Sequence, residues 1–209
     1  MQKITENKIE AKEEIYLILA EFFKNPTEDF YLEISNGTID ERLKTLYSIA
    51  DYNYPDTISF IDQFPNYSSY VNSYTLSFLV GAKSCTPVES IYKVWTSDPS
   101  NEMYNTKGSI FGDPALHIRY LFEQYKLELP NEYANIPDHI TLLLEFLAFL
   151  IKNRTSTEVK QFISDHFDWL EDFKKELSKT EFSSLYLDIT DLIINTTQNE
   201  LLYLVSNKE

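Results

Sequence analysis

Cysteine and glycine are scarce in this sequence of 209 residues, which contains one cysteine, Cys85, and four glycines. A single cysteine can form neither an intrachain disulfide nor a cysteine zinc cluster. So few glycines argue against glycine-rich phosphate-binding loops and against a sheet-rich fold with many tight turns. No window alternates strictly enough between apolar and polar residues to predict a β-hairpin.

Positive charge is also scarce, because 18 Lys and Arg residues face 33 Asp and Glu residues, giving a net charge of −15. Nucleic acids and anionic membranes are therefore poor partners, whereas a basic partner is favoured. The longest apolar runs, such as 146–151, are too short to span a membrane, and the amino-terminal residues lack a signal-peptide core. These features predict a soluble, cytoplasmic protein without stable membrane insertion.

Apolar residues at helical spacing are abundant, and 43% of the residues are hydrophobic, which is enough for a packed core. The predicted helices cover 8–23, 39–49, 67–78, 113–125, a stretch from Pro137 to Ile151, and three more segments, the last ending within 192–204. Residues 83–88 and 96–111 are predicted to be non-helical, the second as a long surface loop. We therefore expect one all-α domain over 1–209, a bundle of about nine to eleven helices with flexible ends at about 1–6 and 205–209.

Catalytic and metal-binding motifs are missing from the sequence. None of the histidines, His117, His139 and His166, has a second ligand one helical turn away. Ser90 lacks the glycine-flanked elbow of an esterase nucleophile, and Cys85 has no neighbouring histidine. We therefore predict no enzyme activity, no metal and no cofactor, although nucleotide binding is left open.

Two segments begin like helices with a proline followed by an acidic residue. In Pro137-Asp138-His139, a carboxylate in the first turn would favour the positive end of the helix dipole, which accounts for Asp138. A protonated histidine is disfavoured there, so His139 needs another explanation. Pro87 and Glu89 are also typical of a helix start. A hydrolase using the Asp138–His139 pair is disfavoured, because neighbouring helical residues do not face each other.

In combination, these segments resemble the TorD/DmsD/NarJ family of redox-enzyme maturation chaperones over roughly residues 12–195. The matching stretches are Tyr74 to Phe78 with Gly81, Pro87 to Tyr92, Pro137 to His139, Leu144 to Leu147, and His166 to Leu170 with Phe173. The sequence departs from the family at Ser77, where leucine is usual, and at Leu143, where a first glutamate is common. These departures bear on which client, meaning the protein that the chaperone would bind, is served.

The resemblance implies a TorD-like helical fold and a cytoplasmic role without catalysis. Such proteins bind the twin-arginine signal peptide, or the N-terminal segment, of a molybdopterin oxidoreductase catalytic subunit until cofactor insertion and folding are complete. The peptide-binding residues implied by the resemblance are Tyr74, Phe78, Glu89, Ser90, Tyr92, Asp138, His139 and Glu145. The client is not indicated, and the protein is expected to be a monomer or a homodimer, in which the 96–111 loop could act as a hinge for helix exchange.

An acidic helical interaction or regulatory module that binds a basic partner is the alternative hypothesis. Its binding would depend mainly on charge and would be abolished by salt, whereas a chaperone with an apolar groove would keep part of its affinity.

Overall fold

The computed structural model describes residues 2–55, 57–61, 63–80 and 85–206, and over these residues the chain is helical and contains no β-strand. The ten α-helices of the described residues are α1 (Gln2–Glu21), α2 (Glu28–Ser35), α3 (Thr38–Ala50), α4 (Tyr67–Tyr74), α5 (Glu89–Tyr92), α6 (Asp113–Gln124), α7 (Ile140–Asn153), α8 (Ser156–His166), α9 (Leu170–Leu177) and α10 (Ser184–Ser206). A π-helix, η1 (Thr75–Leu79), continues α4, and a 3₁₀ turn, η2 (Asn131–Tyr133), precedes α7. The predicted all-α class and the approximate number of helices are confirmed.

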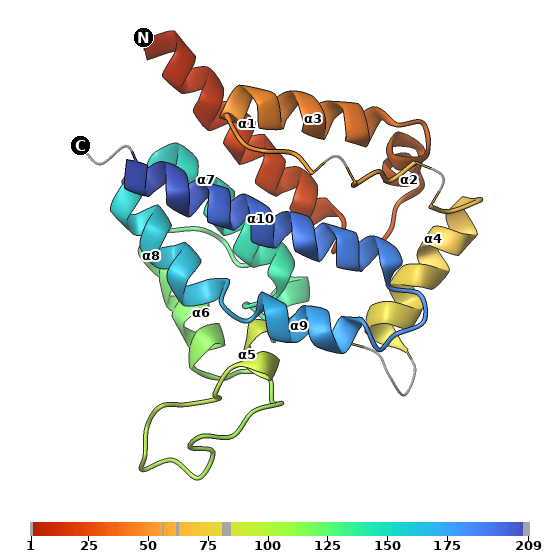
Figure 1. The fold of residues 1–209 in the computed structure, drawn as a ribbon. Coiled ribbons are helices and arrows are strands. Elements are labelled where there is room, and N and C mark those ends of the chain that lie inside the picture. The colour runs from red at the N-terminus through yellow and green to blue at the C-terminus, as the bar shows by residue number, and fades with distance from the viewer. Residues whose placement is uncertain (1, 56, 62, 81–84, 207–209) are drawn as a thin grey trace.

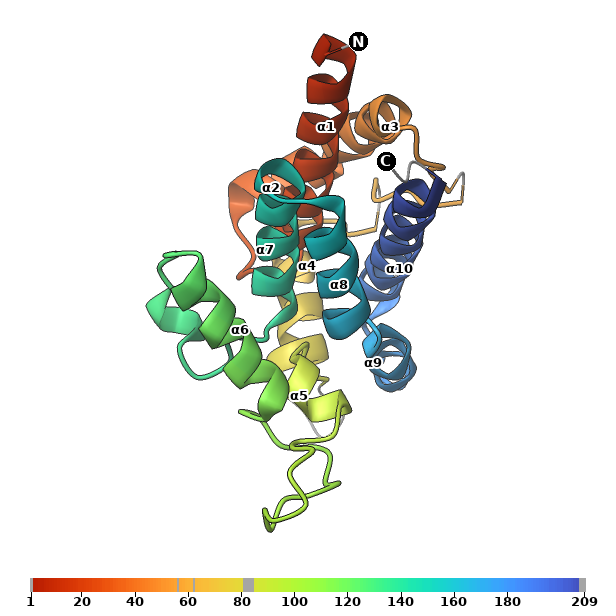
Figure 2. The same cartoon turned by 90° about the vertical axis from the view of Figure 1, so that its left-hand side faces the viewer.

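Helices α1 and α7 pack against each other in the middle of the molecule, and α3 covers another side of α1. Helix α10 runs beside them and contacts α8 and α9, which follow α7 along the chain (Figures 1 and 2). The connection between α5 and α6, residues 93–112, contains no helix and extends at the end of the molecule opposite the start of α1. It includes the 96–111 segment that the sequence predicts to be a surface loop.

Several element boundaries differ from the sequence-based expectation. Helix α2 was not predicted, and the helix expected to begin at Pro137 begins at Ile140. Helices α1 and α10 include residues 2–6 and 205–206. That the ends of the chain are flexible stays a prediction. Residues 1 and 207–209, Gly81 as the expected end of a helix, and the start of the non-helical segment 83–88 lie outside the described residues.

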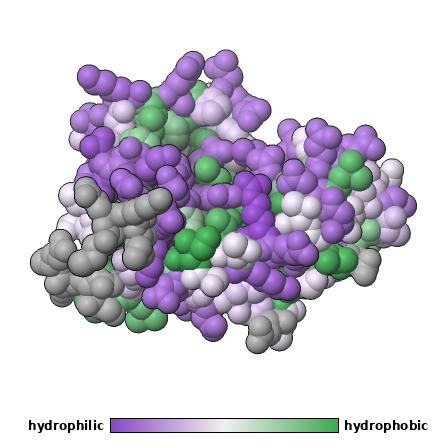
Figure 3. All heavy atoms as spheres, turned by 90° about the horizontal axis from the view of Figure 1, so that it is seen from above, coloured by the Kyte–Doolittle hydropathy of each residue, from purple (hydrophilic) through white to green (hydrophobic). Residues whose placement is uncertain are grey.

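The surface reflects the excess of charged residues. Figure 3, which views the molecule from above relative to Figure 1, shows hydrophilic side chains over most of this face and a smaller hydrophobic area in its middle. Among the described helices, none combines the length and the apolar composition that a membrane crossing requires.

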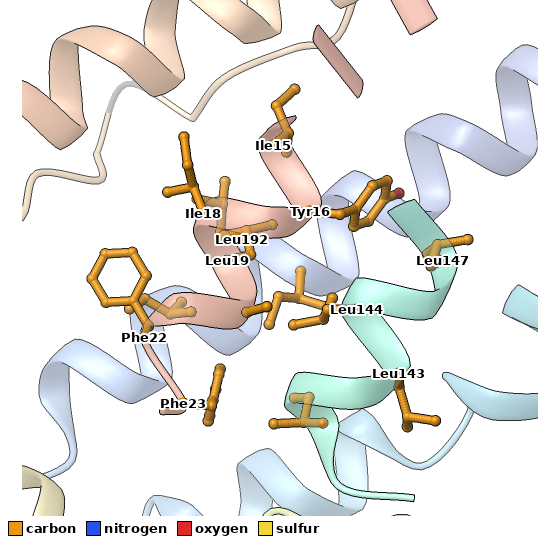
Figure 4. Close-up of a cluster of buried hydrophobic side chains, with 14 of the residues drawn as sticks. Ile15, Tyr16, Ile18, Leu19, Phe22, Phe23, Leu143, Leu144, Leu147 and Leu192 are labelled. Carbon is orange, nitrogen blue, oxygen red and sulfur yellow. The ribbon is translucent and has the colours of Figure 1, made fainter. Parts of the chain in front are cut away.

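The interior is formed mainly by aliphatic and aromatic side chains from α1, α7 and α10. Leu19 and Phe23 from the first segment lie near Leu144 of α7 and Leu192 of α10, and all four are buried (Figure 4). Burying one such side chain contributes roughly 1.5–3 kcal/mol. Because α7 is apolar on nearly all sides and lies within this core, the position of its first turn is fixed by packing.

Candidate functional site

The two proline-containing motifs lie directly against each other, although they are far apart in sequence. The Ile140 N–H donates to the Pro87 carbonyl at 3.0 Å, and the Glu89 N–H donates to the Asp138 carbonyl at 3.1 Å. Val88 and His139 form an isolated antiparallel bridge between these bonds. We call residues 87–92 and 137–140 the motif junction. Residues 137 and 138 form a turn and His139 is extended, which is the reason that α7 begins three residues later than the proline predicts.

Asp138 is fully buried and accepts hydrogen bonds from Ser90. The Ser90 backbone N–H lies 2.7 Å from Asp138 Oδ2, and the Ser90 hydroxyl donates to the same oxygen. Burial raises the pKa of Asp138, while the two bonds from Ser90 oppose that shift. Asp138 lies before the helix cap rather than in the first turn of α7, so the explanation by the helix dipole is wrong. The carboxylate instead joins the two motifs.

Gly112 completes this contact from the far end of the 93–112 loop. Its N–H donates to Ser90 Oγ at 3.2 Å. A Cβ atom at position 112 would lie 2.6 Å from the carbonyl oxygen of Trp95, so only glycine fits without moving the backbone. The loop is thereby held close to the buried carboxylate.

His139 is the N-cap of α7, and its imidazole Nδ1 accepts the Thr141 N–H at 3.3 Å. The side chain is 7% exposed, and burial lowers its pKa from 6.5 to about 4. A neutral imidazole offers an acceptor to the free N–H groups of the first turn without placing a positive charge there. This resolves why a histidine is tolerated at this helix start.

Glu89 is also fully buried, and its side-chain partners are His166, which is distant in sequence, and Lys93, which is close. His166 Nδ1 lies 2.8 Å from Glu89 Oε2, and His117 Nδ1 lies 2.9 Å from His166 Nε2. The Lys93 ammonium lies 3.2 Å from Glu89 Oε1. Burial raises the pKa of Glu89, and His166 and Lys93 counteract that effect. Only Lys93, four residues after Glu89, could have been found by helical spacing.

Tyr92 lies on one wall of a cleft of about 580 Å³. Its ring stacks on Trp169 with centroids 5.2 Å apart, and its hydroxyl donates to the Thr86 carbonyl at 3.0 Å. The cleft is lined by Cys85, Thr86, Ile91, Tyr92, Lys107, Gly108, Asp172, Lys175 and Glu176. The Lys107 ammonium and the Asp172 carboxylate, 3.7 Å apart, join the 93–112 loop to α9.

The other predicted site residues are not part of the motif junction. Tyr74 and Phe78 pack edge-to-face, 5.3 Å apart, and Phe78 lies 4.5 Å from the ring of Tyr186 on α10. Glu145 pairs with Lys24 at 2.8 Å on the outer side of α7. The structure therefore brings together Glu89, Ser90, Tyr92, Asp138 and His139, and leaves these three outside. Their roles in binding a peptide stay predictions.

Tyr133 of η2 was not predicted from the sequence to be a site residue. It lies between His139 of the motif junction and Glu145, which is outside the junction. Its ring lies 5.1 Å from the ring of His139. Burial raises the pKa of Tyr133, and the nearby Glu145 carboxylate adds to the shift. No motif surrounds this tyrosine in the sequence, so only the fold could reveal it.

The site has the geometry of a structural polar network rather than of a catalytic centre. Asp138 faces Ser90 and His139 faces Thr141, so the neighbouring acid and histidine do not form a proton-transfer pair. Within the described part of the chain, no group of three His, Cys, Asp or Glu residues is arranged to hold a metal ion. This arrangement is suited to binding a ligand in the cleft that Tyr92 lines, beside the network of buried acidic side chains.

An all-helical fold with this motif junction defines a class of helical accessory proteins, and comparison with known families identifies the class. The family described as nitrate reductase delta subunit matches residues 68–179, which is more than half of the chain and includes the whole motif junction. The chain belongs to this family, the NarJ/TorD family that its motifs resemble.

Curated relatives in the same family are named as chaperones. The chain is 34% identical over 90 residues to a Tat proofreading chaperone DmsD from Haemophilus influenzae, covering 43% of this chain and 44% of the relative. It is 21% identical over 138 residues to a chaperone protein TorD from Colwellia psychrerythraea, covering 66% of this chain and 58% of the relative. The matches thus span about half the length of these relatives.

A solved structure shares the fold over nearly the whole chain. It is a crystal structure of a protein described as a redox enzyme maturation protein from Archaeoglobus fulgidus, with a TM-score of 0.53 and 22% identity. The alignment covers 93% of each chain. The helical arrangement is therefore one that this class of protein adopts.

Proposed function

We propose that this protein is a cytoplasmic maturation chaperone without catalytic activity. It binds the twin-arginine signal peptide, or the N-terminal segment, of a molybdopterin oxidoreductase subunit, and holds it until cofactor insertion and folding are complete. The names of the relatives from Haemophilus and Colwellia, both chaperones, support this role. The observation that carries the proposal is the motif junction, in which Glu89 and Asp138 are buried beside the cleft that Tyr92 lines.

The cleft beside Tyr92 is the proposed peptide site. Tyr92 and Ile91 offer apolar contact on one wall. The carboxylates of Asp172 and Glu176 on α9 are paired with Lys107 and Lys179, and the arginine side chains of the peptide would replace these lysines. Glu89, Ser90 and Asp138 have no exposed surface. We therefore assign these three to holding the cleft wall, and the direct contact to residues on its surface.

The charge of the protein favours the proposed ligand. A twin-arginine segment is basic and is followed by an apolar stretch, and the net charge of −15 accelerates its encounter with the protein. Micromolar affinity corresponds to about −8 kcal/mol, which a few buried aromatic contacts and one or two arginine–carboxylate pairs can supply. Such moderate affinity suits a ligand that must be released.

Titration with a synthetic twin-arginine signal peptide tests the proposal. Trp169, stacked on Tyr92 and 2% exposed, provides the fluorescence that should change as the cleft fills. We expect saturable binding by the unmodified protein. The double variant Asp138→Ala/His139→Ala should bind at least about tenfold more weakly, because each of the two substitutions removes hydrogen bonds that join the motif junction.

A matched double variant, Glu41→Ala/Lys44→Ala on the exposed side of α3, should bind like the unmodified protein. Circular dichroism shows whether each variant is folded. Absence of saturable binding, or equal affinity in the folded Asp138/His139 variant, would contradict the proposed site.

A further inference from the structure

Glu89, His166 and His117 form a continuous line of hydrogen-bonding atoms from the core to the surface. Each residue comes from a different helix: Glu89 begins α5, His166 ends α8, and His117 lies on α6. The exposed fraction of the side chains rises from Glu89 to His117: Glu89 is 0% exposed, His166 is 2% exposed and His117 is on the surface. We call these three residues the acid–histidine line.

Aromatic packing fixes the rings of the line. The His117 and His166 rings are stacked with centroids 4.9 Å apart, and the Phe162 ring lies 4.8 Å from that of His166. Tyr120 stacks on the outer side of His117 at 6.5 Å. Two histidines held in this way by neighbours on α6 and α8 have little freedom to turn away from each other.

The same histidine also supports the wall of the cleft. The Trp169 indole N–H donates to the His166 carbonyl at 2.9 Å, and the Trp169 ring stacks on Tyr92, which lines the cleft. His166 therefore contacts the motif junction through its side chain, at Glu89, and the aromatic wall through its backbone. Displacing it would affect both.

The hydrogen bonds of the line are complete when both histidines are neutral. His117 Nδ1–H then donates to His166 Nε2, and His166 Nδ1–H donates to the Glu89 carboxylate. A further proton from solvent can add only at Nε2 of His117, which leaves these bonds unchanged. Burial lowers the pKa of His117, and His166 and Lys93 add to that shift, whereas Asp165 opposes it. A negative charge on Glu89 at the inner end would also oppose it.

Other charged groups surround the line on every packed element. Lys93 lies against Glu89 and also donates to the Asp165 carbonyl and the Asp168 carboxylate, at 2.7 Å and 2.9 Å. Asp138 faces the line from the residues before α7, and its charge acts on Glu89. The Lys93 ammonium is thus shared between the buried Glu89 carboxylate and the exposed Asp168 carboxylate, so it neutralises the charge of Glu89 only in part.

We propose that His166 is a positioning residue of the peptide site, and that the acid–histidine line is one coupled unit ending at His117. His166 holds Glu89, and with it the Tyr92–Trp169 wall, in the shape that accepts the peptide. This inference rests on the proposed function for the meaning of the site, but the coupling within the line can be tested without any peptide.

The first experiment measures the titration of His117 by NMR in the unmodified protein and in Glu89→Gln. A glutamine keeps an acceptor for His166 Nδ1–H and removes only the charge. We expect the pKa of His117 to fall in Glu89→Gln, because the negative charge that favours its protonated form is lost. An unchanged His117 titration would overturn the coupling, because a merely structural carboxyl group would not affect that pKa.

The second experiment measures affinity for the twin-arginine peptide in two variants of His166. Phenylalanine keeps the ring but removes both nitrogen contacts, and should weaken binding at least about tenfold. Glutamine offers a donor and an acceptor, and should keep affinity within about threefold of the unmodified protein. Equal binding by folded His166→Phe and the unmodified protein would overturn the positioning role, as would glutamine failing to restore binding.

The NMR titration and the affinity measurement distinguish failure of the proposed function from failure of the coupling within the acid–histidine line. If the unmodified protein does not bind the peptide, the proposed function fails, and the NMR arm still decides whether the line is coupled. If His166→Phe does not fold, the glutamine variant and the Glu89→Gln titration still decide the proposal.

Discussion

At the scale of single residues, burial gives two adjacent side chains opposite tasks. Asp138 accepts the N–H and hydroxyl of Ser90 and so joins two distant segments, whereas His139 caps its own helix by accepting the Thr141 N–H. The histidine serves this purpose only in its neutral form. Its pKa of about 4, lowered by burial, keeps it neutral through the whole physiological range.

Protonation of His139 should contribute to unfolding in acid. The folded histidine has a pKa of about 4 against 6.5 when unfolded, so the unfolded chain binds more protons between these values. The free energy of unfolding should therefore fall as the pH drops from 6.5 towards 4, by up to about 3 kcal/mol from this residue. Urea unfolding at a series of pH values measures the change.

The variant His139→Asn is the control, because asparagine also caps helices but does not titrate in this range. Its stability should decline less steeply with acid than that of the unmodified protein. Buried carboxyl groups with raised pKa values, such as Glu89 and Asp138, act in the opposite direction and are common to both proteins. If the free energy of unfolding fell equally with pH in both proteins, His139 would not make this contribution.

At the scale of helices, α1 and α10 are joined by a buried ion pair. The Lys12 ammonium lies 3.0 Å from a Glu200 carboxylate oxygen, and both side chains are at most 4% exposed. The ammonium also lies 3.5 Å from the ring centroid of Tyr203. Burial lowers the pKa of Lys12 and raises that of Glu200, so each charge is maintained mainly by its partner.

Removing one member of this ion pair should lower the free energy of unfolding more, relative to its own contribution, than removing both members together. Lys12→Met or Glu200→Gln alone leaves a buried charge unpaired and should lower the free energy of unfolding by about 3–5 kcal/mol. The double variant Lys12→Met/Glu200→Gln should lose clearly less than the sum of the single losses. A double-mutant cycle in urea measures the coupling.

The half-exposed pair of Lys174 and Asp191 provides the comparison within the same protein. Its coupling should be at most about 1 kcal/mol, because water screens both charges. Similar coupling energies for the two pairs would contradict the importance assigned to burial.

At the scale of the whole molecule, the helical protein carries a net charge of −15, and the face seen in Figure 3 is mostly hydrophilic. This charge attracts any basic partner, so attraction alone does not distinguish a chaperone with an apolar cleft from a general acidic module. Salt separates the two, because it screens charge at distances beyond a few ångströms and leaves apolar contact in place. Whether the molecule acts as a monomer or a homodimer stays a prediction.

Peptide binding should therefore weaken with salt but persist. Raising the salt concentration from about 0.1 M to about 1 M shortens the screening length from about 10 Å to about 3 Å. We expect reduced but measurable affinity for the twin-arginine peptide at the higher concentration, followed by Trp169 fluorescence. A peptide with the arginines retained and the apolar stretch replaced by serines is the matched control, and it should lose binding almost completely. Equal loss for both peptides would favour the general acidic module.

Much of the helical architecture could be predicted from local pattern. Apolar residues three and four apart indicated most helices, including the one that forms α7, since this spacing places side chains on one face of a helix. The start of α7 was predicted three residues early, because Asp138 and Ile140 hydrogen-bond with residues 87–90 of another segment. Competition from a distant partner is not visible in a local pattern.

The motifs also predicted that Glu89, Ser90, Asp138 and His139 matter, without showing how they meet. His117 and Tyr133 were not identified, because no motif surrounds them and their partners come from other helices.

The sequence by itself determined the helical class, the acidic character and the absence of disulfide chemistry, because these follow from composition and from contacts within one helical turn. Only the tertiary structure decided which polar groups pair. His166 is separated by 77 residues from Glu89 and by 49 from His117. Their alignment is set by the packing of helices around α7, and burial then requires each polar atom to find the partner that this packing provides.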